Sequence, residues 1–284
     1  MSHVGVILAG SAIWLAVFLL LYQFTAVLGR AWKESLPKQV CLSHAQTVTI
    51  ASYLTSSLNA VICCCSVPVA LHAFPGLKNI FSNLFEGQGI YGPLLPHTQI
   101  FYYSFLGYLL YDGLFMVLNP VTAARDWYLV SHHVLYFSIT LFFFETQKFP
   151  LLALTLVAQE ISTPFLNAFW IMKILKVQAT ASALFFANAV LMTFLFGLLR
   201  VIVPGAVLAT LLYLASKGTY DDKLSRADWT VVLIVAMGCL LQVYWFGKIL
   251  VGFRKAFSGD ISAPTTPEQA QLVRVTDDQG DSDV

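Results

Sequence analysis

Length, composition and charge place the chain in a membrane. Its 284 residues are 58% hydrophobic and only 11% charged, with a formal net charge of +1. Soluble domains are about 45–50% apolar and about 25% charged, so this chain has too few charges to cover a soluble fold of its size. A net charge near zero argues against nucleic acid as a partner. The five cysteines form neither a CxxC pair nor a spaced framework, so the sequence predicts no metal centre and no disulfide scaffold.

The chain contains a series of apolar segments, each close to the about 20 residues that a helix needs to cross about 30 Å of hydrocarbon. They cover roughly residues 4–28, 44–71, 98–118, 127–146, 149–171, 183–203 and 229–252. Backbone groups in lipid must pair within their own segment, so each span is expected to be helical. The predicted fold is an all-α polytopic membrane protein with about seven transmembrane helices.

One stretch complicates this count. Residues 198–215 continue the sixth segment past Arg200 and Pro204. Proline inside a helix removes a hydrogen bond and bends the chain. The piece after Pro204 would be about 16 Å long as a helix, which is too short to cross the bilayer alone. We therefore expect a bent extension of the sixth span or an interfacial stretch; a separate crossing would raise the count to eight and move the tail to the other side.

Three parts are expected along the chain. Residues 1–39 form an N-terminal transmembrane helix and loop, residues 40–255 form the main membrane domain, and residues 256–284 form a disordered cytosolic tail because they are rich in acids, Ser, Thr and Pro. Lys and Arg favour the cytosolic side of a membrane protein, and they are more numerous in the connections on the side of residues 29–43 and the tail. This bias places the N-terminus in the lumen and the C-terminus in the cytosol.

Ionisable side chains within the spans form a small set: Asp112, His132, His133, Glu160 and Arg200. Such groups are rare in membranes and usually face a cavity or a partner. At 1.5 Å per residue, Asp112 lies about 9 Å from the end of the third span, and the two histidines lie about 8–9 Å into the fourth. The carboxylate and both imidazoles are therefore expected at the same depth on neighbouring helices. Arg200 is expected to be a snorkelling or helix-end residue near the lumenal end of the sixth span.

Helical spacing predicts which polar residues share a face. Adjacent residues point about 100° apart, so one histidine would face a central cavity while the other points to a neighbouring helix. The sequence leaves open which of the two is reactive. Ser104, Tyr108 and Asp112 share one face by their i+4 spacing, and Asn167 lies on the face of Glu160, seven residues earlier. A polar stripe of this kind favours a cavity over a helix that faces only lipid.

With these residues identified, the chain resembles the TLC-domain family, which includes ceramide synthases and translocation-associated membrane proteins. The likeness runs from about residue 40 to 255, and the first span is an added N-terminal helix. It rests on "GYLLYDGLFMV" at 107–117, "WYLVSHHVLYF" at 127–137, "QEISTPFLNAFW" at 159–170 and, more weakly, "LLRVIVP" at 198–204. The third piece is similar to the smaller TLC-domain-containing branch.

The resemblance implies six helices around a membrane cavity that opens toward the cytosol, and a role in lipid metabolism or homeostasis in the endoplasmic reticulum or another endomembrane. Membrane lipids are the implied partners. No bound cofactor is implied, and acyl-CoA is a candidate co-substrate. The implied activity is a ceramide-synthase-like N-acyl transfer from acyl-CoA to an amine such as a sphingoid base. The catalytic residues would be His132, His133 and Asp112. The polar head of the lipid substrate would be bound by Glu160, Ser162, Asn167, Tyr108 and Arg200.

Two departures from the family pattern keep other functions open. Phe169 stands where the smaller branch usually has an arginine, and the His pair is followed by "VLYFSITLFFFE" in place of the downstream His-Asp and paired acids of ceramide synthases. The missing acids favour a non-catalytic regulator of membrane lipid composition, or a sorting or scaffold protein. A proton-coupled transporter is a third alternative, because Asp, Glu and His chains also relay protons. The absence of repeated halves and paired broken helices in the sequence argues against it.

Overall fold

A computed structural model describes residues 3–35, 42–73, 96–118, 127–146, 148–175, 182–218 and 224–257. These residues form helices and no strand. In chain order the helices are α1 (His3–Ser35), α2 (His44–Ala73), α4 (Pro96–Leu118), α5 (Trp127–Thr146), α6 (Pro150–Ala158), η2 (Gln159–Ser162), α7 (Thr163–Ile174), α8 (Ser182–Phe196), η4 (Gly197–Ile202), α9 (Val203–Ser216) and α10 (Arg226–Phe257).

The predicted fold class is confirmed. Six helical stretches in the described part of the chain are long and apolar enough to cross a membrane: His3–Ala31, His44–Cys65, Ile100–Leu118, Leu151–Ile174, Ala183–Ser216 and Arg226–Arg254. α5 is a further helix of 20 residues, in the place predicted for the fourth span. The predicted disordered tail, 256–284, lies outside the described residues from residue 258 onward.

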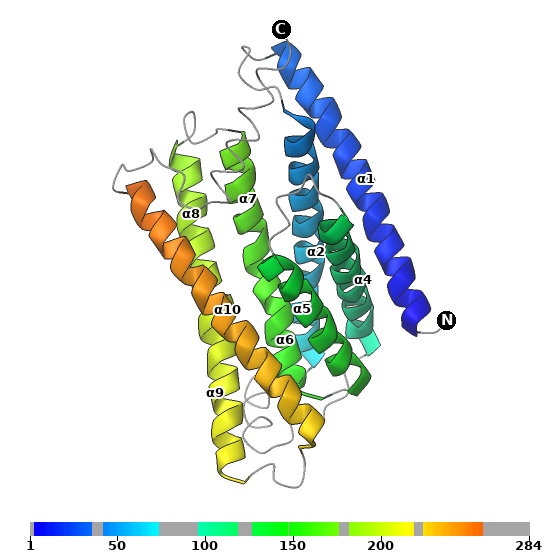
Figure 1. The fold of residues 1–284 in the computed structure, drawn as a ribbon, viewed down its shortest axis with the longest axis vertical. Helices are drawn as coiled ribbons and strands as arrows, with labels where there is room; N and C mark the ends of the chain where they lie inside the picture. The colour runs from blue at the N-terminus through cyan, green and yellow to red at the C-terminus, as the bar shows by residue number, and fades with distance from the viewer. Residues whose placement is uncertain are drawn as a thin grey trace.

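The stretch after Arg200 is an extension of the sixth span. α8, η4 and α9 run on as one candidate span, Ala183–Ser216, and α9 continues the line of α8 (Figure 1). The η4 segment has π-helical geometry, in which the backbone N–H of Val203 reaches back to the carbonyl of Leu198. A wider turn at this point accommodates Pro204, whose ring would otherwise crowd the carbonyl of Arg200. The stretch therefore adds no eighth crossing.

The span that holds the Glu160 motif is also irregular in its middle. α6 gives way to the 3₁₀ segment η2, which leads directly into α7. Pro164 occupies the first turn of α7, where its missing N–H costs least. The tighter winding lets the backbone N–H of Thr163 bond to the carbonyl of Glu160. The irregular segments η2 and η4 lie against each other inside the bundle.

Successive spans alternate in direction, with α6–α7 and α8–α9 each running on as one span, and distant parts of the sequence lie side by side (Figure 1). α1 packs on α4 and α2, while α10 packs on α5, α8 and α9. α4 and α5 meet at mid-height in this view, well below the upper ends of α2, α7 and α8. Residues near this meeting point therefore lie deep within the bundle.

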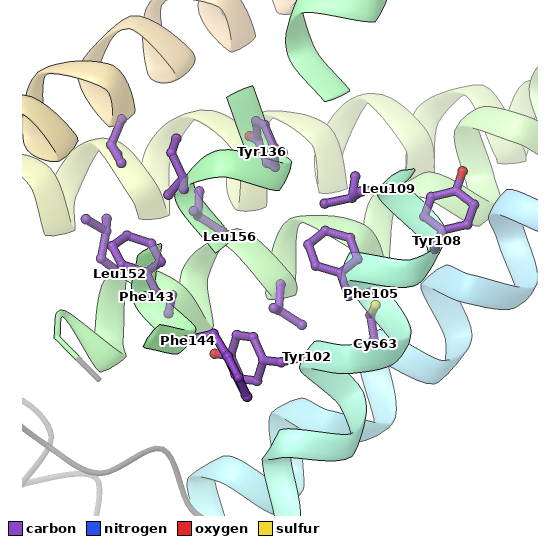
Figure 2. Packing of buried hydrophobic residues seen from close by; sticks show 14 of the residues in the cluster. Cys63, Tyr102, Phe105, Tyr108, Leu109, Tyr136, Phe143, Phe144, Leu152 and Leu156 are labelled. Atoms are coloured by element: carbon purple, nitrogen blue, oxygen red, sulfur yellow. The ribbon is translucent and has the colours of Figure 1, made fainter. Parts of the chain in front are cut away.

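The core is a cluster of buried apolar and aromatic side chains. Figure 2 shows side chains from α2, α4, α5 and α6 turned toward one another, with Cys63, Phe105, Phe143 and Leu152 among those labelled. The long apolar side chains of α1 and α10 are instead widely exposed, as Leu20 at 71% and Leu240 at 70% show. An apolar core together with exposed apolar side chains on the outer helices is expected of a helical bundle surrounded by lipid.

An ion pair joins the connection before α6 to the first turn of α10 at one end of the bundle. Lys148 Nζ lies 2.7 Å from Asp228 Oδ2, and the Asp228 side chain is almost fully buried. The same carboxylate accepts hydrogen bonds from the backbone N–H and the hydroxyl of Ser225, which precedes α10. The contact shows that the connections before α6 and before α10 lie on one side, as the order of the predicted spans requires. Which compartment that side faces stays a prediction.

Candidate functional site

The centre of the candidate site is an ion pair between α4 and α5. His133 Nε2 lies 2.8 Å from Asp112 Oδ2, and both residues are buried. The residues are close because α4 and α5 pack together. The predicted proximity of the carboxylate to the histidine pair is thus confirmed for His133. A carboxylate in apolar surroundings is costly unless it is paired and hydrogen-bonded, so this pair is the expected form of a buried Asp.

Tyr108 completes the environment of this carboxylate. One turn before Asp112 on the same face of α4, it donates its hydroxyl to Asp112 Oδ2 at 3.1 Å. The Tyr108 hydroxyl also hydrogen-bonds with Ser56 of α2. One carboxylate oxygen therefore accepts from both the imidazole and the phenol. The arrangement links α2, α4 and α5 through a short polar chain whose members fix one another's orientation.

The two histidines have different surroundings. His132 packs its ring against Tyr136, with ring centroids 4.1 Å apart, and against Trp245 of α10 at 5.1 Å. Its Nδ1 atom is buried and has no hydrogen-bond partner among the described residues. His133 holds the carboxylate of Asp112. The two imidazoles therefore contact different helices, His133 facing α4 and His132 facing α10. That one of them faces a central cavity stays a prediction.

A second polar group surrounds Tyr136, and the sequence analysis missed it. The Tyr136 hydroxyl donates to Gln159 Oε1 at 2.6 Å and accepts from Gln242 Nε2 at 3.1 Å. All three side chains are buried, and they join α5, η2 and α10. The search for ionisable residues passed over them because none carries a charge. Glutamine in an otherwise apolar span was the available signal, since such side chains hydrogen-bond between helices.

Arg200 is the clearest correction to the sequence analysis. It is not a snorkelling residue at a helix end; its side chain is only 7% exposed and points into the bundle. Its Nε donates to the Ser162 hydroxyl at 2.7 Å, and one terminal nitrogen donates to the Thr163 hydroxyl at 2.6 Å. The same nitrogen lies 3.7 Å from Glu160 Oε1. The error arose because depth was counted along a regular helix that was taken to end near Pro204.

These contacts make a compact buried charge network between η2 and η4. Thr163 donates its hydroxyl to Glu160 Oε2 at 2.8 Å while it accepts from Arg200, so it bridges the two charges. Gln159, the residue before Glu160, accepts a hydrogen bond from Tyr136, whose ring packs on His132. The network and the histidine pair therefore lie in one interior region.

The remaining predicted site residue, Asn167, has a different place. Its amide donates to the backbone carbonyl of Tyr53 at 3.0 Å and to the Ser57 hydroxyl at 3.1 Å, so it ties α7 to α2. The described contacts bring together Tyr108, Asp112 and His133 in one group and Glu160, Ser162 and Arg200 in another. The predicted cavity and its opening toward the cytosol stay predictions, as do the catalytic and lipid-binding roles.

The chemical capacity of the region follows from these groups. It offers an imidazole oriented by a carboxylate, a second imidazole with an unsatisfied nitrogen, and a guanidinium whose charge is offset by Glu160. Among the described residues, no group of three or more His, Cys, Asp or Glu side chains is placed to hold a metal ion. Acid–base work and hydrogen bonding to a polar ligand are the chemistry that these side chains themselves supply.

Comparison with known proteins identifies the domain. The TLC domain matches residues 43–251. A similar curated protein is the TLC domain-containing protein 4-B of Danio rerio, with 30% identity over 157 residues that make up 55% of this chain and 58% of that protein. The alignment thus spans less than two thirds of the relative's length. No solved structure matches the chain. The match covers most of the chain and includes the helices that carry both polar groups, so the chain belongs to the TLC-domain family.

Proposed function

We propose that this protein binds a membrane lipid within its helical bundle, with the polar head of the lipid near the Asp112–His133 pair. The observation that carries the proposal is this buried pair, 2.8 Å apart, within two predominantly apolar helices. Ionisable residues at such depth are expensive to keep and usually serve a ligand or a pathway. The exposed apolar flanks of α1 and α10 suit a protein whose ligand enters from the bilayer.

Buried polar atoms without hydrogen-bond partners support the proposal that the lipid head group binds in this region. Buried side-chain polar atoms normally have a partner, and each exception calls for an explanation. Within the described residues, His132 Nδ1 and Gln242 Oε1 have none. His132 packs its ring against Tyr136, and Gln242 donates to the hydroxyl of the same tyrosine, so the two residues with unpaired atoms both contact one side chain. A hydroxyl, amine or amide on a ligand would satisfy them.

A second candidate function is acyl transfer at this site, and the orientation of His133 favours it. When the Nε2–H donates to Asp112, the neutral ring carries its basic lone pair on Nδ1. That nitrogen would take the proton from an attacking amine as the new N–C bond forms and the thioester C–S bond breaks, and it would return the proton to the departing CoA thiolate. Asp112 would stabilise the imidazolium, as the third member of a catalytic triad does.

Without that reaction, the same groups would form a lipid site in a regulatory, sorting or scaffold protein of an endomembrane, with the endoplasmic reticulum as the proposed compartment. The acyl-transfer proposal takes its substrate class from the likeness to ceramide synthases: acyl-CoA as donor and an amine such as a sphingoid base as acceptor. A positive result for lipid binding would support both functions, so two separate experiments are needed.

The first experiment tests lipid binding. The protein is purified in mild detergent, and co-purified lipids are compared by mass spectrometry between the native protein, the His132→Ala/His133→Ala double variant and a His44→Ala control. His44 lies at the start of α2 and contacts Tyr22, outside the site. We expect a specific lipid in the native protein and the control, reduced at least about ten-fold in the double variant, which corresponds to about 1.4 kcal/mol. Equal lipid content in all three samples would contradict the proposal.

The second experiment separates the catalytic from the non-catalytic function. Purified protein in liposomes is given acyl-CoA and a sphingoid base, and N-acylated product is measured. If acyl transfer occurs, we expect the double variant to lose it, since general acid–base residues contribute about 10²–10⁴-fold to a rate. Undiminished transfer by the double variant would remove the histidines from the mechanism. Lipid binding without transfer by the native protein would favour the regulatory function.

A further inference from the structure

The N-terminal helix α1 lies outside the TLC-domain match at 43–251, yet it packs directly on α4, the helix that carries Asp112. In Figure 1 α1 runs along the outer side of α4 and α2. Most of its apolar side chains face outward, but Trp14 and Phe18 are buried. An appended helix that only anchored the chain in the membrane would have no need of such buried contacts.

The contact between α1 and α4 is close and depends on the glycine at 107, which faces Gly10 and Ser11 of α1. A Cβ atom on Gly107 would lie 2.8 Å from the backbone carbon of Gly10 and 2.9 Å from the nitrogen of Ser11. Real Cβ atoms essentially never approach backbone so closely, so the two helices touch backbone to backbone at this point. Small residues at helix crossings allow this type of packing in membranes. The register of α1 on α4 is therefore narrowly defined.

This register places Trp14 against the site. One turn after Gly10, its indole N–H donates to the backbone carbonyl of Ser104 at 3.0 Å. Its ring meets the ring of Tyr108 edge to face, with centroids 5.6 Å apart. Tyr108 in turn donates its hydroxyl to Asp112, which holds His133. An unbroken series of contacts thus runs from α1 to the imidazole.

Attachment of α1 to α4 does not by itself require the contact between Trp14 and Tyr108. One turn further along, Phe18 packs on Phe115 at 4.7 Å and on Tyr111 at 6.1 Å, and these contacts already attach α1 to α4. Trp14 differs from Phe18 because its ring packs against Tyr108, the residue that hydrogen-bonds the Asp112 carboxylate. If the Tyr108 ring rotated, the carboxylate would lose one of its two donors.

We propose that α1 is part of the functional site and that Trp14 is a positioning residue. It holds Tyr108 so that the phenol donates to Asp112, and this fixes the carboxylate that orients His133. The consequence for lipid handling rests on the function proposed above. The orientation of the imidazole does not, and it can be measured in the absence of any lipid substrate.

The test uses the full chain in detergent with ¹⁵N-labelled histidine rings, whose nitrogen chemical shifts report tautomer and hydrogen bonding. The chain has six histidines, and His133 is assigned by its loss in a His133→Asn variant. Trp14→Phe is compared with Tyr108→Phe, which deletes the donor itself, and with Trp229→Phe as the matched control. Trp229 is 42% exposed and lies near the start of α10.

We expect the ring-nitrogen shifts of His133 to move in the same direction in Trp14→Phe and Tyr108→Phe and to stay native in Trp229→Phe. Gly107→Ala is a second perturbation, since it must displace α1, and Gly247→Ala is its control because no atom lies within 4 Å of the added Cβ. Native His133 shifts in both Trp14→Phe and Gly107→Ala would overturn the proposal. If Gly107→Ala fails to fold, Trp14→Phe alone decides.

Failure of this inference and failure of the lipid proposal give different results. If the His133 ring-nitrogen shifts change in Trp14→Phe but the native protein holds no specific lipid, Trp14 is a positioning residue and the proposed lipid function is wrong. Specific lipid lost in His132→Ala/His133→Ala but retained in Trp14→Phe with native shifts would keep the lipid function and remove α1 from the site. In either case the full chain is measured, with α1 in place.

Discussion

Arg200 offers the sharpest test of the interior described here, because its burial reverses what its place in the sequence suggests. Arg200→Met keeps a long, flexible side chain and removes the charge and every donor. The native guanidinium makes two short hydrogen bonds, to Ser162 and Thr163, and lies 3.7 Å from the Glu160 carboxylate. After the change, Glu160 keeps the hydroxyl of Thr163 but has no cation beside it.

The magnitude follows from this contact set. Removing one partner of a buried ion pair costs about 3–5 kcal/mol, because the remaining charge is left in apolar surroundings. Glu160 is 12% exposed, so we place the expected loss at the lower end, about 3 kcal/mol. A snorkelling arginine would behave as a surface residue, with an effect within about 0.5 kcal/mol. A buried Arg200 and a snorkelling Arg200 therefore predict losses in the free energy of unfolding that differ several-fold.

The assay is equilibrium unfolding in mixed micelles of mild detergent and sodium dodecyl sulfate, followed by tryptophan fluorescence. Arg254→Met is the control, since Arg254 is exposed near the end of α10. A double-mutant cycle with Glu160→Gln isolates the pair, and contacting residues show coupling of about 0.5–3 kcal/mol. An Arg200→Met protein as stable as the Arg254→Met control, with no coupling to Glu160, would refute the buried network.

Two further changes test the packing around the site by the same unfolding measurement. Gly197→Ala should destabilise the protein by about 1–3 kcal/mol, because the new Cβ would lie 2.7 Å from the ring of Phe246 and overpack the contact. The control Gly247→Ala should cost far less. Equal losses in the two variants would contradict the contact between Gly197 and Phe246. Lys148→Met should cost about 3 kcal/mol because it leaves the buried Asp228 carboxylate without its cation, and a native midpoint would show that the Ser225 donors suffice.

Much of the fold could be predicted from the sequence because lipid imposes strict rules. Apolar length and internal backbone pairing fix where helices lie, and the predicted spans coincide with the helices to within a few residues at most ends. The meeting of Asp112 with His133 was also predictable, since depth along two sequential helices follows from residue number. Both predictions depend only on regular helices.

The remaining features depend on packing that the sequence does not specify. Rotation of α10 about its axis decides that Gln242 faces Tyr136, and residue number along a helix predicts depth but not which neighbouring side chain is met. The place of Arg200 depends on the continuation of the helix through η4, where a π turn absorbs Pro204. Two apolar helices can pack in many ways, so the close crossing of α1 and α4 does not follow from the sequence.

The two prolines explain why the charge network lies where it does. Pro164 and Pro204 each follow a charged residue by four positions, so each removes the helical partner of that residue's carbonyl: Glu160 in one span and Arg200 in the other. The backbone responds with the 3₁₀ segment η2 and the π segment η4, and these lie against each other. Irregular backbone at membrane depth is tolerated only where it is buried in protein. Each irregular segment therefore requires a polar, protein-filled neighbour, and the Glu160–Arg200 pair with the Ser162 and Thr163 hydroxyls supplies it for both.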